Sequence, residues 1–147
     1  MIMTTMAMSD ISTEVDGTET SYIDAVKQAM AKAYAPYSKY PVGALVVTKD
    51  GQIFAGCNVE NASYPEGNCA ETAAIAAMVM SGHQRIQKIY IMSQDDQGAT
   101  PCGGCRQRIR EFADNNTPVI LCSPAGVQKR LALSDLLPHA FGPEFLL

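Results

Sequence analysis

The chain has 147 residues, of which 47% are hydrophobic and 18% are charged, a composition typical of one globular domain with a sizeable buried core. Its formal net charge of −4 argues against a nucleic-acid polymer as partner, because phosphate binding requires a basic surface. The sequence has no apolar run near the roughly 18 residues that a membrane-spanning helix needs. It also lacks the basic start and apolar stretch of a signal peptide, so we expect a cytoplasmic protein with reduced cysteines.

The first twenty residues differ in pattern from the segment that follows. Residues 1–20 are rich in Met, Thr, Ser, Asp and Glu and show no period, so we expect a flexible tail before a single domain formed by residues 21–147. From Ser21 to Tyr34, apolar residues recur at helical spacing. We expect Ser21 to cap this helix and Pro36 to end it.

Strand and helix patterns alternate along the rest of the chain. The apolar runs Val42–Val47 and Gln52–Asn58 flank an Asp-Gly pair, which predicts a hairpin. The run Glu71–Ser81 is apolar on all sides, which predicts a buried helix with Gly82 as its C-cap. Gly103–Asp114 predicts a second, more charged helix, and the alternation indicates an α/β or three-layer α-β-α domain. The other expected elements are strands at Lys88–Ser93, Pro118–Cys122 and Lys129–Leu133, and a helical turn at Ser134–Leu137.

Two short motifs carry the strongest chemical signal. One is Cys69-Ala70-Glu71 and the other is Pro101-Cys102-Gly103-Gly104-Cys105, each at the start of an expected helix. Together they match the signature of zinc deaminases, whose first ligand is His or Cys. Three thiolates at helix N-termini can hold three corners of a tetrahedral zinc ion and leave the fourth for water, whose pKa zinc lowers. Glu71 lies two residues from a ligand, close enough to move protons without binding the metal.

Two other interpretations of these cysteines stay open at this point. In a structural zinc site, Cys57 or Cys122 would supply a fourth ligand, although Cys69 lacks the nearby partner of the usual paired pattern. In a redox site, Cys102 and Cys105 would form a reversible disulfide, but redox C-x-x-C pairs normally follow an early strand. A catalytic zinc site is the interpretation we favour.

Several longer blocks make the chain resemble the cytidine deaminase family, in its short, single-domain branch. They are Tyr34–Tyr40, Gly56–Tyr64, the two cysteine motifs and, more weakly, Leu136–Phe141. The resemblance implies a three-layer α-β-α fold around a mixed sheet of about five strands. It also implies zinc-dependent hydrolysis of cytidine and deoxycytidine to uridine and deoxyuridine by a homotetramer whose sites are completed by neighbouring subunits.

The resemblance assigns roles to individual residues. Cys69, Cys102 and Cys105 would bind zinc, and Glu71 would shuttle protons. Asn58 and Glu60 would hydrogen-bond the ribose hydroxyl, which needs both a donor and an acceptor. The remaining substrate contacts would come from Tyr40, stacking on the pyrimidine where the family usually has Phe, from the Ala70 backbone, and from Phe141, inserted into a neighbouring subunit's site.

One position departs from the family pattern. The short branch often has Arg directly after the catalytic Glu, where it donates to the thiolates, and this chain has Thr72. Arg106, which follows Cys105, is a candidate substitute donor. The blasticidin S deaminase relatives also lack Arg at this point, so a modified aminopyrimidine nucleoside stays an alternative substrate. The intact Asn58–Ala62 block favours an ordinary ribose.

Overall fold

The structure is a computed structural model that describes residues 16–147, so most of the expected tail lies outside the described residues. Its centre is a five-stranded sheet in the order β2-β1-β3-β4-β5. Strands β3 and β4 run parallel and the other neighbours are antiparallel, which makes the sheet mixed as expected. The strands are β1 (Gly43–Thr48), β2 (Ile53–Cys57), β3 (Ile86–Met92), β4 (Pro118–Ser123) and β5 (Gly126–Ala132).

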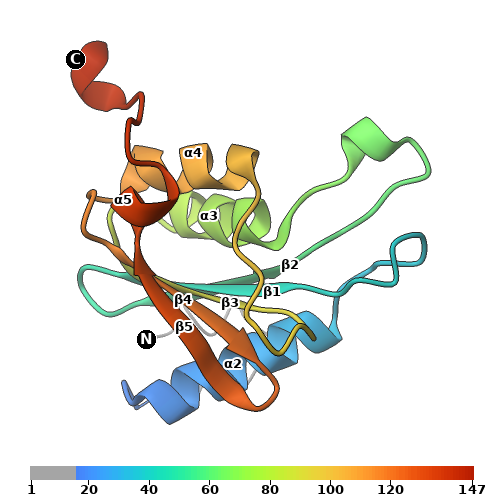
Figure 1. Cartoon of the computed structure of the whole chain (residues 1–147). Coiled ribbons are helices and arrows are strands. Elements are labelled where there is room, and N and C mark those ends of the chain that lie inside the picture. The colour runs from blue at the N-terminus through green and yellow to red at the C-terminus, as the bar shows by residue number, and fades with distance from the viewer. Residues whose placement is uncertain (1–15) are drawn as a thin grey trace.

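Helices cover both faces of the sheet and confirm the three-layer arrangement (Figure 1). Helix α2 (Glu19–Ala31) packs on one face, and α3 (Ala70–Met80) and α4 (Gly103–Phe112) pack on the other. The short elements are α5 (Leu133–Leu136) and two 3-10 turns, η1 (Tyr64–Glu66) and η2 (Pro143–Phe145). No helix within residues 16–147 has the length and apolar character needed to cross a membrane.

Helix α2 differs from the expected helix at both ends. It begins at Glu19, and the hydroxyl of Thr18, not that of Ser21, caps it by accepting from the Ser21 backbone N–H at 3.3 Å. It ends at Ala31, before Tyr34, because the Tyr34 backbone pairs with the segment after β2. The Tyr34 N–H donates to the Asn58 carbonyl at 3.0 Å, and the Tyr34 carbonyl accepts from the Glu60 N–H at 2.9 Å.

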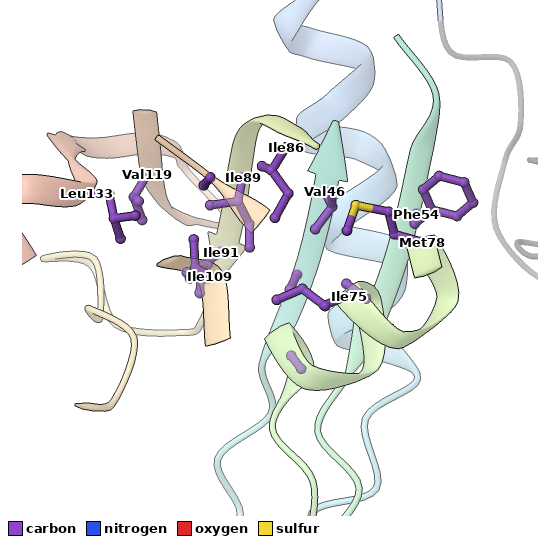
Figure 2. Packing of buried hydrophobic residues seen from close by; sticks show 14 of the residues in the cluster. Val46, Phe54, Ile75, Met78, Ile86, Ile89, Ile91, Ile109, Val119 and Leu133 are labelled. Atoms are coloured by element: carbon purple, nitrogen blue, oxygen red, sulfur yellow. The ribbon is translucent and has the colours of Figure 1, made fainter. Parts of the chain in front are cut away.

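The central strands are buried on both faces. Along β1, Ala44 and Val46 belong to the cluster under α3 and α4, whereas Leu45 and Val47 belong to the cluster under α2. Figure 2 shows the first cluster, in which Ile75 and Met78 of α3 pack against side chains of the sheet. Strand residues alternate between faces, so a strand covered on both sides is apolar throughout.

Two glycines let the helices approach the sheet closely. A Cβ at Gly56 of β2 would lie 2.5 Å from the Ala70 carbonyl oxygen and against the Ala74 backbone nitrogen of α3. A Cβ at Gly43 of β1 would lie 2.6 Å from the Val26 carbonyl oxygen of α2. The absence of a side chain at Gly56 therefore sets the height of α3, the helix that begins next to Cys69.

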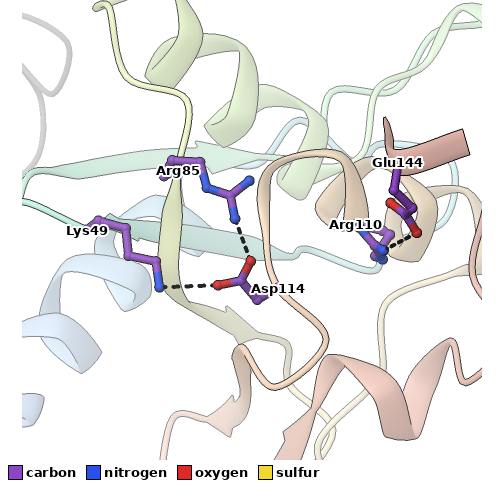
Figure 3. A network of polar contacts seen from close by, with 5 residues as sticks. All are labelled: Lys49, Arg85, Arg110, Asp114 and Glu144. Atoms are coloured by element: carbon purple, nitrogen blue, oxygen red, sulfur yellow. Dashed lines mark hydrogen bonds and ion pairs between the residues drawn. The ribbon is translucent and has the colours of Figure 1, made fainter. Parts of the chain in front are cut away.

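Helix α4 and strand β5 have bounds that differ from those expected from the sequence. Helix α4 ends at Phe112, before Asp114, whose carboxylate accepts from Arg85 at 2.6 Å and lies 3.6 Å from the Lys49 ammonium (Figure 3). Strand β5 begins at Gly126, earlier than Lys129, because its pairing with β4 continues to the Ser123–Gly126 pair. Gly82 was expected to be the C-cap of α3, but Ser81 is the C-cap and Gly82 follows it with the left-handed φ of +92.

Candidate active site

Three cysteine sulfurs meet where helices α3 and α4 begin. Cys69 is the N-cap of α3, Cys102 is the N-cap of α4, and Cys105 lies in the first turn of α4. The three Sγ atoms all lie within 4.8 Å of one another. Zinc–sulfur bonds of about 2.3 Å in a tetrahedron place sulfurs about 3.8 Å apart, so this cluster has the size and chemistry of a zinc site.

The positions of these cysteines leave their sulfurs available for a metal. Neither N-cap side chain hydrogen-bonds its own helix, as a Ser or Asp at that position would. Burial raises the pKa of the Cys69 and Cys105 thiols, whereas the backbone N–H of Cys105 lowers the pKa of Cys102. The helix N-terminus therefore favours the thiolate only at Cys102, and a bound dication would hold all three cysteines as thiolates.

The cluster has three sulfurs and no fourth among the residues that the structure describes. Cys122 lies in the core cluster under α2, on the opposite face of the sheet, and Cys57 is not part of the group. Cys102 and Cys105 are both free thiols. Three protein ligands with an open fourth position are the arrangement of a catalytic zinc site, and they do not form the four-cysteine site of a structural zinc.

Glu71 lies in the first turn of α3, two residues after Cys69. Its side chain is buried, with 5% of the residue exposed. Burial raises the pKa of the Glu71 carboxyl, and a hydrogen bond with Cys105 and the charge of Arg108 partly offset that rise. A buried carboxyl with a raised pKa, two residues from a ligand, suits the proton shuttle predicted from the sequence.

Asn58 uses its side-chain amide to hold the chain between Tyr40 and Val42. Its Oδ1 accepts from the Val42 backbone N–H at 2.8 Å, and its Nδ2 donates to the Tyr40 carbonyl at 2.9 Å. An amide group has two donor hydrogens and two acceptor lone pairs, so one of each remains for a ligand.

Glu60 binds the same loop at Tyr37 and Ser38, just before Tyr40. Its Oε1 accepts from the backbone N–H groups of Tyr37 at 3.0 Å and Ser38 at 3.1 Å, and its Oε2 accepts from the Ser38 hydroxyl. These bonds lower the pKa of the Glu60 carboxyl and leave it one free acceptor position. Both residues expected to bind the sugar thus also shape the loop that carries Tyr40.

The loop and the metal cluster are joined through one short bridge. Val59, which lies between Asn58 and Glu60, exchanges two backbone hydrogen bonds of 2.9 Å with Asn68. Asn68 immediately precedes the ligand Cys69. The expected sugar-binding residues and the first zinc ligand are therefore held in fixed relation.

Comparison with known proteins agrees with this geometry. Residues 17–121 match the family model described as the cytidine and deoxycytidylate deaminase zinc-binding region. The chain belongs to this deaminase family. The cytidine deaminase of Sporosarcina psychrophila is 40% identical over 120 residues, which cover 82% of this chain and 88% of the relative.

Solved structures of this family resemble the fold. The crystal structure of cytidine deaminase from Burkholderia pseudomallei matches with a TM-score of 0.79 at 41% identity, covering 84% of this chain and 99% of that one. The structure from Mycobacterium tuberculosis matches with a TM-score of 0.67 at 38% identity, covering 80% and 91%. The cluster of Cys69, Cys102 and Cys105 is the zinc-binding centre of this deaminase-family chain.

The structure corrects one expectation for this family member. Arg106 does not substitute for the missing Arg at position 72, because its guanidinium binds three neutral oxygens. It donates to the Pro101 carbonyl at 2.7 Å, the Leu136 carbonyl at 2.9 Å and the Thr100 hydroxyl at 3.2 Å. Arg106 thus braces the loop before Cys102 against α5, and these hydrogen bonds do not go to the thiolates.

Other side chains of this deaminase-family chain surround a hollow of about 340 Å³ next to Glu60. Tyr37 and Tyr64 contact each other there with ring centroids 5.9 Å apart. Tyr37 and Ser38 belong to a sequence block that marked the family, but only Tyr40 was assigned a role. The hollow is lined by Tyr37, Ser38, Glu60, Asn61, Tyr64 and Gly67.

The remaining expected substrate contacts occupy different environments. Ala70 is buried in the first turn of α3, beside the metal cluster. Tyr40 is 43% exposed, so its ring face is accessible. Phe141 is 55% exposed and stacks on Phe145 at 5.3 Å, in a C-terminal segment that extends away from the body of the domain (Figure 1).

Proposed function

We propose that the protein hydrolyses cytidine and deoxycytidine to uridine and deoxyuridine with release of ammonia. The observation that carries this proposal is the position of the buried Glu71 carboxyl beside three cysteine sulfurs that hold zinc. Named relatives that share the chain's family are cytidine deaminases, which supports the choice of substrate.

Zinc bound by the three cysteines supplies a Lewis acid that makes water nucleophilic near neutral pH. Glu71 accepts a proton from that water and delivers it to the ring nitrogen, which makes the amine-bearing carbon electrophilic. The water oxygen adds to that carbon, and the second proton of the water passes through Glu71 to the amine, which leaves as ammonia when the carbon–nitrogen bond breaks. Because burial raises the pKa of Glu71, its carboxyl can both accept and release a proton in one cycle.

Asn58 and Glu60 are proposed to bind the sugar through the hydrogen-bonding positions that their loop contacts leave free. The second amide hydrogen of Asn58 can donate to a hydroxyl, and the free lone pair of Glu60 can accept from it. Because cytidine and deoxycytidine are both proposed substrates, this hydroxyl is one that ribose and deoxyribose share. A nucleoside that lacks it is disfavoured, because the polar groups then stay unpaired. Tyr40 is proposed to stack on the pyrimidine and the Ala70 backbone to contact its polar edge.

We also propose that the active enzyme is a homotetramer in which Phe141 enters a neighbouring subunit's site. Helix α3 is apolar all round, and its outer residues Val79 and Met80 are exposed in the single chain. The C-terminal segment is tied to α4, because Gln107 donates to the Phe141 carbonyl at 2.8 Å and Arg110 pairs with Glu144 at 2.7 Å (Figure 3). This segment therefore presents Phe141 outward in a defined place.

The oligomer proposal is tested with Phe141→Ala. We expect the variant to remain tetrameric in sedimentation while its KM for cytidine rises about fivefold, because loss of a buried aromatic contact costs about 1 kcal/mol. Phe145→Ala, which removes the ring stacked on Phe141, is the matched control for the C-terminal segment. A monomeric wild-type protein with full activity would refute the proposal.

The substrate proposal is tested by spectrophotometric assay of purified protein with cytidine and deoxycytidine, together with metal analysis. We expect turnover that depends on about one zinc per chain, and a loss of several orders of magnitude in Glu71→Ala with zinc retained. Zinc binding without turnover of either nucleoside would redirect the search to modified aminopyrimidine nucleosides.

The use of three free thiols as ligands supports a reducing compartment, and we propose that the protein is located in the cytoplasm.

A further inference from the structure

The zinc centre holds more negative charge than the ion neutralises. Three thiolates around one dication leave one excess negative charge, and an ionised Glu71 adds a second. Charge in a partly buried site is costly unless an opposite charge lies close to it. A nearby cation therefore favours the zinc-loaded state.

Helix α4 carries three arginines near this site, and two of them are engaged elsewhere. Arg106 binds three neutral oxygens, and Arg110 pairs with Glu144. Arg108 forms no hydrogen bond or ion pair with any residue in the described range 16–147. Its charge is therefore available to the zinc centre.

The Arg108 side chain runs back over the first turn of α4. Its Nη1 lies 2.9 Å from the point that a Cβ at Gly104 would occupy, and Gly104 lies between the ligands Cys102 and Cys105. Helical side chains lean toward the N-terminus and cover the residue four positions earlier, which explains this reach. The guanidinium therefore lies against the helical turn that carries the ligands Cys102 and Cys105.

This placement is unfavourable unless negative charge is present. The N-terminus of a helix carries partial positive charge, which repels a cation. The first turn of α4 has no acidic residue to compensate. Glu111 lines the same groove as Arg108, but the two side chains form no ion pair. The other negative groups near the first turn of α4 are the zinc-bound thiolates and Glu71.

We propose that Arg108 supplies the countercharge of the three-thiolate zinc site. Thr72 of α3 and Arg108 of α4 line the same groove between these helices. Thr72 carries no charge, so Arg108 supplies the positive charge from the opposite side of the groove. The inference rests on the proposed zinc-dependent function, but it concerns metal retention, which can be measured without substrate.

The experiment measures zinc transfer from the holoenzyme to a chromogenic chelator. Arg108→Gln should weaken zinc binding roughly three- to tenfold, as expected for one partly screened unit charge several ångströms away. Arg108→Lys should restore most of the affinity. Thr72→Arg in the Arg108→Gln background should also restore it, because the new guanidinium enters the same groove. Lys129→Gln, which removes an exposed positive charge from β5, is the control and should leave zinc affinity unchanged.

The readouts separate this inference from the substrate proposal. A zinc affinity of Arg108→Gln within twofold of wild type, or a loss that neither Arg108→Lys nor the second-site arginine restores, overturns the role of Arg108. Loss of zinc affinity in a protein that fails to deaminate cytidine leaves the role of Arg108 intact and overturns only the substrate. Urea unfolding of each zinc-loaded variant identifies a general loss of fold, which Lys rescue would not correct.

Discussion

The side-chain amide of Asn58 donates to the backbone carbonyl of Tyr40 over 2.9 Å, so the residue expected to bind the sugar also holds the residue expected to stack on the base. The same amide accepts from Val42, where β1 is about to begin. Sugar recognition and placement of the stacking ring are therefore coupled through one side chain. A change at Asn58 should disturb both.

Substitution of Asn58 tests this coupling. Asn58→Ala loses both bonds and should destabilise the fold by about 2 kcal/mol, at about 1 kcal/mol for each bond. Asn58→Asp keeps the acceptor for Val42 but sets a carboxylate against the Tyr40 carbonyl. We expect KM for cytidine to rise in both variants while zinc content stays at the wild-type value. A variant with normal KM and normal stability would show that the brace is dispensable.

Gly56→Ala tests the close packing of α3 on β2. The new Cβ would lie 2.5 Å from the Ala70 carbonyl oxygen, so the helix that follows Cys69 must move. We expect a loss of at least about 2 kcal/mol in urea unfolding, together with weaker zinc binding. Gly103→Ala is the control, because its Cβ would meet nothing within 4 Å. Equal stability of the two variants would contradict a packing role for Gly56.

Local patterns predicted the elements and the metal cluster well, because both depend on short-range spacing. Helical periodicity located α3, and the two cysteine motifs placed three ligands at helix starts. Helix ends were less predictable. Helix α2 stops at Ala31 because Tyr34 pairs with backbone 24 or more residues away in sequence, and no local pattern carries that information.

The contacts of long polar side chains were the least predictable part of the site. Arg106 was a candidate donor to the thiolates by sequence proximity, but its partner Leu136 lies on α5 and was visible only after folding. Asn58 likewise binds backbone groups 16 and 18 residues away. The position of Arg108 over Gly104 follows the i, i+4 spacing of a helix, although no motif in the sequence assigns Arg108 a role.

Glu19 ties α2 to β3 and β5, and we expect the protein to lose this stabilising contribution as pH falls. Its carboxylate accepts from the Tyr90 hydroxyl at 2.9 Å and from the Arg130 guanidinium at 2.8 Å. The hydrogen bond from Arg130 is the main cause that lowers the pKa of Glu19. A depressed pKa means that the stabilisation is present above the unfolded-state value of about 4.3 and is lost as pH falls through the folded-state value.

Glu19→Gln measures this contribution. Glu19 is 37% exposed, so solvent screening limits the expected effect to about 0.5–1 kcal/mol. The difference in unfolding free energy between wild type and variant should be constant from about pH 6 to 8 and should shrink toward zero near pH 3. A difference that persists at pH 3 would assign the effect to packing and not to charge.

Zinc should stabilise the fold by joining the starts of α3 and α4. Cys69 and Cys102 are both N-caps without a side-chain hydrogen bond to their helices, so the metal takes over the role of a cap. Removing zinc with a chelator should lower Tm by about 5–15 °C, as expected when a ligand well above its Kd is withdrawn from a domain of this size.

Two cysteine variants separate the effect of zinc from that of packing. Cys102→Ser should show the lower Tm already and respond little to the chelator. Cys122→Ser should lose stability through its buried position on the other face of the sheet and keep the full chelator shift. Equal Tm values for the loaded and stripped wild-type protein would mean that the two helix starts are held together without the metal.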